Sequence, residues 1–269
     1  MAHPATGAFS WTSGTVHPEV VLGTIALGAA WLAAHVVRGE PLVRARALAF
    51  FTGLAMFLVA LSGPLHDAAE FFLFSAHMVQ HLLLTLVGVP LLLAGTPIWM
   101  GDALLANGRR RWLVRQLTRP VPALALYSIA LGGWHFPGPY GAALAVPAWH
   151  VVEHATLVLT ATLAWWPVLG PSTVAPRIPY GAQILHLFVF GIPMTVVAAM
   201  VTGADHPLYE FYVHAPRITT LDPLEDQRLG GLIMWVPAGL IPLIAFTAVF
   251  FRWAAAERDD TTDQSPAPR

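Results

Sequence analysis

Two pairs of histidines in this sequence have the spacing of metal ligands on a helix. His77 and His81 lie four residues apart in the segment SAHMVQHLLL, and His150 and His154 repeat that spacing in AWHVVEHATL. Side chains four residues apart project from one face of an α-helix, so each pair can offer two imidazoles to one ion. Two such helices in a bundle can together supply four nitrogen ligands to a transition metal.

A purely structural role is the alternative interpretation, because neutral imidazoles can also hydrogen-bond between neighbouring helices. For two pairs at similar depth we favour a metal or cofactor site, with His135 as a further ligand from a third helix. Gln80 and Glu153 lie next to the pairs and could fix the imidazole tautomers through hydrogen bonds. Glu153 could equally join two helices without any ligand.

The methionines bear on the kind of metal. Met78, Met200 and Met234 are candidates for additional ligands, and a thioether together with imidazole suits copper, particularly the reduced ion. Methionine is also a common filler of irregular space in protein cores, which is the alternative role for each of the three. The chain contains no cysteine, so disulfides and thiolate metal sites are excluded.

The composition indicates that most of the chain lies in a membrane. Hydrophobic residues make up 56% of the sequence and charged residues only 11%, whereas soluble domains usually contain about 25% charged residues. The formal net charge of −1 gives no electrostatic reason to expect nucleic acid as a partner. The lipid bilayer is therefore the expected environment, and transmembrane helices must position the histidine pairs.

The apolar segments predict an all-α polytopic membrane protein, a single domain with a bundle of about seven transmembrane helices. A helix needs about 20 apolar residues to cross the hydrocarbon core. The expected spans cover residues 18–37, 45–62, 72–94, 121–136, 148–169, 182–202 and 229–253. No basic region typical of a signal peptide precedes the first span, so we expect this helix in the mature protein. The polar tail over about 256–269 is expected to be disordered.

The arginines predict the orientation of the bundle. The chain has no lysine, and with the N-terminus outside, every arginine except Arg217 and Arg228 falls on the cytoplasmic side. Positive residues are enriched in cytoplasmic loops, which selects the N-out, C-in orientation. In this orientation all histidines except His35 and His186 lie in the outer half of the protein. We therefore expect any metal site near the outer face.

Five motifs along the chain resemble one protein family. The segments SAHMVQHLLL, GGWHFP, HVVEH, WWPVLGP and DQRLGGLIMWVP are similar to those of the seven-helix CtaG-type cytochrome c oxidase assembly factors of Gram-positive and related bacteria. The resemblance implies a non-enzymatic, multi-pass protein of the bacterial cell membrane that helps to mature haem-copper oxidases. It implies copper handling on the outer side, with oxidase subunits as partners. The positions it points to are His77, His81, His135, His150 and His154, with Gln227 and Met234 in the last motif.

Three other functions are compatible with the same residues. A membrane redox protein could hold a haem between a histidine of the 72–94 span and one of the 148–169 span. A copper transporter would need polar residues through the inner half of the bundle, where the sequence offers little besides Gln183 and His186. A scaffold for oxidase subunits would use the histidine pairs only as hydrogen bonds between helices. Copper is thus the expected ligand, with haem as the alternative.

Reporter fusions test the predicted orientation. A reporter that works only in the cytoplasm should be active when fused after the last span, because the arginine distribution places the C-terminus inside. The same reporter should be inactive when it is inserted in the loop between residues 206 and 228. A C-terminal fusion that is active only with an exported reporter would contradict the N-out, C-in orientation.

Overall fold

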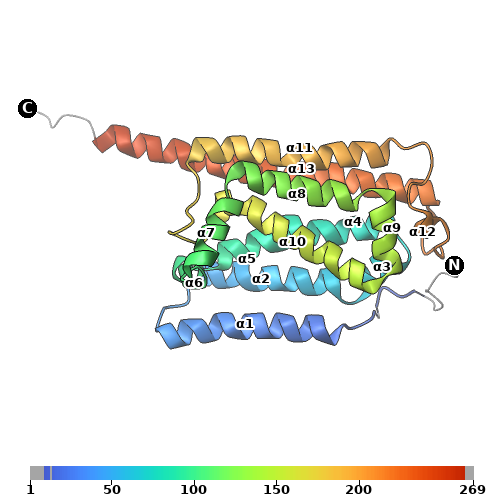
Figure 1. Ribbon diagram of the computed structural model, residues 1–269, viewed down its shortest axis with the longest axis horizontal. Coiled ribbons are helices and arrows are strands. Elements are labelled where there is room, and N and C mark those ends of the chain that lie inside the picture. Colours follow the sequence, from blue (N-terminus) through green and yellow to red (C-terminus); the bar gives the residue numbers. More distant parts are fainter. Residues whose placement is uncertain (1–8, 13, 264–269) are drawn as a thin grey trace, which may run out of the picture.

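The protein is a bundle of helices joined by short loops. The computed structural model describes residues 9–12 and 14–263, with no β-strand among them, which confirms the all-α prediction. Long helices run roughly alongside one another, and shorter ones lie at the two ends (Figure 1). The long helices are α1 (Pro18–Arg38), α2 (Arg44–Leu61), α8 (Pro120–Trp134), α10 (Pro147–Leu169), α11 (Tyr180–Thr202), α13 (Pro223–Asp263), and the continuous rod of α4 (Phe74–Leu82), η1 (Leu83–Gly88) and α5 (Val89–Gly95).

The shorter helices define the two ends of the bundle. One end, called here the histidine end, carries α3 (Pro64–Phe71), α9 (Pro137–Ala145) and α12 (Glu210–Val213). The opposite end carries α6 (Ile98–Leu104) and α7 (Gly108–Leu117) (Figure 1). Helices α3 and α9 lie in segments that we expected to be loops. Each begins with a proline, a residue that is favoured in the first turn because its fixed φ suits a helix.

Several of these helices have the properties of membrane spans. Among the described residues, five helices are long and apolar enough to cross a membrane: Pro18–Arg38, Arg44–Leu61, Phe74–Gly95, Tyr180–Thr202 and Pro223–Arg258. The two other expected spans are also helical. Helix α8 is apolar but has only 15 residues, and α10 has 23 residues that include two histidines and a glutamate. The number of spans and their orientation stay predictions.

The last helix is longer than expected at both ends. It begins at Pro223 rather than near 229, because Asp222 accepts hydrogen bonds from the backbone N–H groups of Leu224 and Glu225. Glu225 in turn accepts one from the N–H of Asp222, which completes a capping box. At its other end the helix runs to Asp263, past 253 and into the tail expected to be disordered from about 256. The run AAAER contains strong helix formers. Residues 264–269 lie outside the described part.

The rod that begins with α4 is the most enclosed of the candidate spans. In its most apolar stretch 61% of the residues are buried, compared with 17% in α1. Asp226 of α13 accepts hydrogen bonds from the backbone N–H of Phe74, at 2.7 Å, and from the hydroxyl of Ser75. A carboxylate at this position satisfies N–H groups that have no partner within the helix. The start of α4 is thereby fixed against α13.

A π-helical turn, η1, interrupts this rod just after His81. The hydroxyl of Thr85 donates to the carbonyl of His81 at 2.7 Å, and the indole N–H of Trp165 in α10 donates to the carbonyl of Thr85 at 3.0 Å. A π turn adds a residue to a helical turn and is frequent at functional sites. Here one of its carbonyls joins α10 to the rod beside the histidines.

The close approach of α13 to α4 can be tested at Gly230. A Cβ there would overlap the ring of Phe74, which is itself stacked on Tyr209 with ring centroids 4.7 Å apart. Overpacking of this kind costs about 1–3 kcal/mol, so Gly230→Ala should lower the melting temperature of the detergent-solubilised protein. Gly239→Ala is the control in the same helix, since a Cβ there meets nothing within 4 Å and alanine favours helix. Equal melting temperatures for the two variants would contradict this packing.

Candidate metal centre

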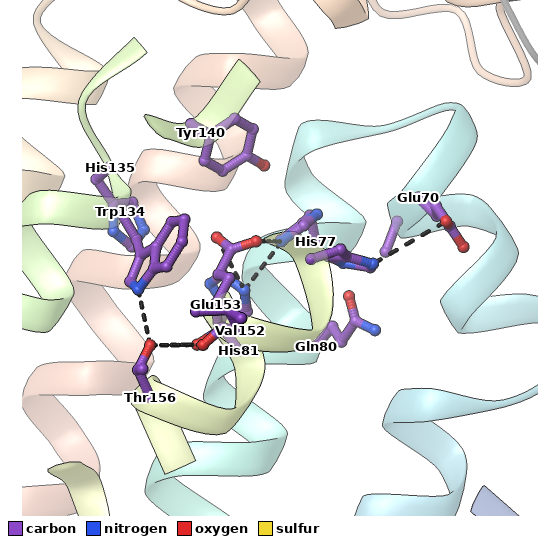
Figure 2. Close-up of polar contacts among 12 residues, drawn as sticks. Glu70, His77, Gln80, His81, Trp134, His135, Tyr140, Val152, Glu153 and Thr156 are labelled. Atoms are coloured by element: carbon purple, nitrogen blue, oxygen red, sulfur yellow. Dashed lines mark hydrogen bonds and ion pairs between the residues drawn. The ribbon is translucent and has the colours of Figure 1, made fainter. Parts of the chain in front are cut away.

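Three side chains of α10 and one of α4 form a compact group at the histidine end. His150, Glu153 and His154 share one face of α10, because positions i, i+3 and i+4 are neighbours on a helix. They meet His77 of α4, and one possible ligand atom from each of the four side chains lies within 4.8 Å of the others. Figure 2 shows the carboxylate of Glu153 turned toward His77 and His81.

The second histidine of α4, His81, lies beside this group. Its Nε2 is 2.9 Å from Nε2 of His77 and 3.7 Å from Oε1 of Glu153. The other oxygen of Glu153, Oε2, is 3.9 Å from Nε2 of His77. The rings of His81 and His154 have centroids 5.2 Å apart. Both histidine pairs thus meet around one carboxylate, and Glu153, which the sequence placed only beside the pairs, lies among them.

The group is enclosed, and several of its polar atoms have no hydrogen-bond partner within the described protein. His77 and Glu153 are fully buried, and neither carboxylate oxygen of Glu153 accepts a hydrogen bond. Nε2 of His150 and Nε2 of His154 also lack partners. An unpaired buried polar group costs about 1–3 kcal/mol, and more if it is charged, so such groups are rare. Imidazole and carboxylate lone pairs gathered in so small a volume fit a bound cation.

A tyrosine selects the position of the proton on His77. The hydroxyl of Tyr212, in α12, donates its single proton to the carbonyl of Ala69 at 2.7 Å. It therefore accepts a hydrogen bond from Nδ1–H of His77 at 3.2 Å. This tautomer leaves the lone pair on Nε2, the nitrogen that faces His81 and Glu153. Partners of metal-binding imidazoles commonly act in this way.

His135, the fifth predicted ligand, lies next to the compact group, on the side where Met78 and Met234 are found. Its Nδ1 donates to the carbonyl of Leu131 at 2.7 Å, and its buried Nε2 has no hydrogen-bond partner. A cavity of about 10 Å³ is lined by His135 together with His81, Met78 and Met234. A volume of this size holds about one water-sized particle. Thioethers and imidazoles therefore share one small space next to the compact group.

Two of the other predicted residues lie outside the centre. Met200 is 44% exposed on α11, whereas Met194, earlier in the same helix, lines the small cavity and was not predicted. Gln227 accepts a hydrogen bond from the N–H of Leu208 and donates to the carbonyl of Val201. The contacts of Gln227 thus fasten the start of α13 to the end of α11 and the loop that follows.

Gln80 leads from the centre to a second polar cluster that the sequence analysis missed. Its amide donates to the carbonyl of Ala60 at 2.8 Å and to Nδ1 of His66 at 3.0 Å. Nε2 of His66 then donates to Oε2 of Glu70 at 2.8 Å. Burial raises the pKa of Glu70, but the hydrogen bond from His66 outweighs this effect, and the pKa lies below its ordinary value. The i, i+4 spacing in HDAAE was the available signal for this pair.

The family of the chain follows from comparison with known proteins. The family model described as cytochrome c oxidase caa3 assembly factor (Caa3_CtaG) matches residues 26–256, and the chain belongs to this family. The match confirms the resemblance seen in the motifs of α4, α8, α10 and α13.

Relatives occur in mycobacteria. The chain is 27% identical over 259 residues to uncharacterized proteins of Mycobacterium bovis and Mycobacterium tuberculosis, and 25% identical over 206 residues to one of Mycobacterium leprae. The first two alignments cover 87% of this chain but 38% of each relative, and the third covers 68% and 30%. The chain therefore corresponds to well under half of these longer proteins. No solved structure matches it.

The contact between Tyr212 and His77 can be tested by removing one oxygen atom. Tyr212→Phe keeps the aromatic ring and removes the hydroxyl that orients His77. Loss of such a partner lowers metal affinity about 10- to 100-fold, so the affinity of the candidate centre for an added metal, tested with copper and measured by competition with a chelator, should fall by that factor. Tyr180→Phe is the control, because Tyr180 begins α11 at the opposite end of the bundle. Unchanged affinity in Tyr212→Phe would contradict the role of the hydroxyl.

Proposed function

We propose that this protein is a membrane assembly factor that carries copper as cargo for a haem-copper cytochrome c oxidase. Membership of the caa3 oxidase assembly-factor family supports the process. The observation that carries the proposal is the compact group, four possible ligand atoms from His77, His150, Glu153 and His154 within 4.8 Å of one another inside an apolar bundle. The proposed activity is binding and release of an ion, with no covalent reaction.

The donor atoms suit copper. Imidazole binds copper, zinc, iron and nickel, and thioether ligands favour reduced copper among them. Met78 and Met234 line the cavity that also touches His81 and His135, so both kinds of ligand are available side by side. A haem-copper oxidase requires copper to mature, and a protein of its assembly family that offers imidazole and thioether groups is suited to supply it.

Each group of the centre has a distinct part in holding the cargo. The carboxylate of Glu153 would balance the charge of a cation in a region from which water is excluded, where an unbalanced charge is costly. The imidazoles would bind through neutral nitrogens, with His77 held by Tyr212 in the required tautomer. On release of the ion, Nε2 of His77 can hydrogen-bond to Nε2 of His81 at 2.9 Å. That contact lowers the cost of emptying the site.

A haem between α4 and α10 is supported less well. A macrocycle needs a flat apolar slot between its two axial imidazoles. Here the Glu153 carboxylate lies 3.9 Å from Nε2 of His77 and 3.7 Å from Nε2 of His81, so a carboxylate occupies the space in which the macrocycle would lie between α4 and α10. A single ion is therefore the better match to the space among these side chains.

A double variant, His77→Ala with His81→Ala, tests the copper mechanism. Alanine is well tolerated in helices, so the protein should still insert in the membrane. Cytochrome c oxidase activity should nevertheless fall in cells that contain only this variant, and the copper content of the purified protein should fall with it. Added copper should partly restore the oxidase by mass action on the weakened site.

The control is His206→Ala with His214→Ala, which removes two exposed histidines at the same end of the bundle. This variant should keep both its copper and the oxidase activity. Wild-type oxidase activity in cells with a correctly inserted His77/His81 variant would remove the copper mechanism and leave the family membership standing. A Soret band in the absorption spectrum of the purified wild type would support haem instead.

A further inference from the structure

A cavity of about 500 Å³ lies between α1, α2, α3 and α10 at the histidine end. Its polar lining comes from His17, Glu19, His66, Glu70, His150 and His154. The side chain of Glu19 is 73% exposed, whereas the last two histidines belong to the compact group of the metal centre. One cavity thus touches both solvent-accessible side chains and the candidate ligands.

The possible ligands that line this cavity range from partly exposed to buried. The exposed fraction of the side chain is 28% for His17, 22% for Glu70, 8% for His66 and 9% for His150, and Glu153, beyond the lining, is at 0%. The ring centroids of His17 and His66 are 4.6 Å apart, and those of His66 and His150 are 6.0 Å apart. Imidazoles and carboxylates therefore follow one another at short distances from the surface to the buried group.

Glu70 is placed to exchange a cation with His150. Its Oε2 accepts the hydrogen bond from His66, which holds the carboxylate, and its Oε1 lies 4.0 Å from Nδ1 of His150. Metal bonds to carboxylate oxygen and imidazole nitrogen are each about 2.0–2.2 Å long, so an ion midway between these atoms would be within bonding distance of both. The other ring nitrogen of His150, Nε2, is buried and has no hydrogen-bond partner. A neutral imidazole carries its proton on one nitrogen and its lone pair on the other, so His150 can hold an ion at Nδ1 in one tautomer and at Nε2 in the other.

We propose that this cavity is the path by which the copper ion reaches the buried centre, with Glu70 and His150 as a transient binding station on it. The path rests on the proposed function, because it describes how that same centre is loaded. Glu19 and Glu70 attract the cation to the cavity, and His150 passes it inward by ligand exchange. Each new metal–ligand bond forms as an earlier one breaks, and the ring proton of His150 moves from Nε2 to Nδ1 as the ion passes from the Glu70 side to the buried side. The oxidation state of the ion does not change.

Rapid mixing of the full chain in detergent separates loading from binding. Cu(I) is supplied as its bicinchoninate complex, whose colour is lost as copper moves to the protein. Glu70→Gln keeps the shape of the side chain and removes its charge, so copper uptake should slow about tenfold, a typical effect of focused charge on association rates. The final amount of copper per chain should equal that of the wild type, which also shows that the variant folds. His66→Gln, which releases the Glu70 carboxylate, should slow uptake as well.

Glu210→Gln is the matched control. Glu210 forms an i, i+4 pair with His214 at 3.8 Å at the same end of the bundle, but neither residue lines the cavity. Its uptake rate should equal that of the wild type. Equal rates for Glu70→Gln and Glu210→Gln overturn the path and leave the proposed function intact, as does a lower final copper content in Glu70→Gln, which would place Glu70 in the centre itself. Absence of copper uptake by the wild type overturns the proposed function and the path with it.

Discussion

The burial of one carboxylate among imidazoles, inside an apolar bundle, is the constraint on which the rest of the structure depends. Glu153 is fully buried and accepts no hydrogen bond from the described protein. A charge at such a position needs a positive partner, because the surrounding helices and lipid provide little solvation. The flanking helices must therefore be held firmly in register. Asp226 fixes the start of α4, and Trp165 of α10 bonds to the carbonyl of Thr85 one turn beyond His81.

Aromatic side chains close the bundle above this centre. Tyr140 of α9 packs on Tyr209 with ring centroids 4.3 Å apart, and Tyr209 stacks on Phe74 at 4.7 Å. The hydroxyl of Tyr212 hydrogen-bonds to the carbonyl of Ala69, at this end of the bundle, and to Nδ1 of His77. Burial raises the pKa of the Tyr209 and Tyr212 hydroxyls, so these groups stay protonated and neutral. The segments outside the long helices thus cover the candidate site on this side and orient one of its possible ligands.

The sequence allows the helices, and the placement of each histidine pair on one helix face, to be predicted, because both follow from local periodicity. The meeting of the two pairs was expected from their similar depth and depends on how the helices pack. Rotation about a helix axis could not be predicted where a helix is apolar on all sides. Met78 and Met200 were both candidate ligands in the sequence analysis, yet Met78 is fully buried and Met200 is 44% exposed. Tyr212 and Glu70 come from short helices outside the expected spans, and contacts with distant parts of the chain place them. The central position of Glu153 likewise depends on the facing helix.

The π turn changes the direction in which side chains project from the rod of α4, η1 and α5. Successive residues of an α-helix are rotated by about 100° around its axis. The additional residue accommodated within Leu83–Gly88 therefore shifts the angular setting of everything before it relative to everything after it. Helix α5, which packs on α2, and helix α4, which carries His77 and His81, can therefore each turn their buried side chains toward their own neighbours. In the segment LLTLVG, which is apolar except for Thr85, the number of residues in the turn thus contributes to the direction in which the imidazoles point.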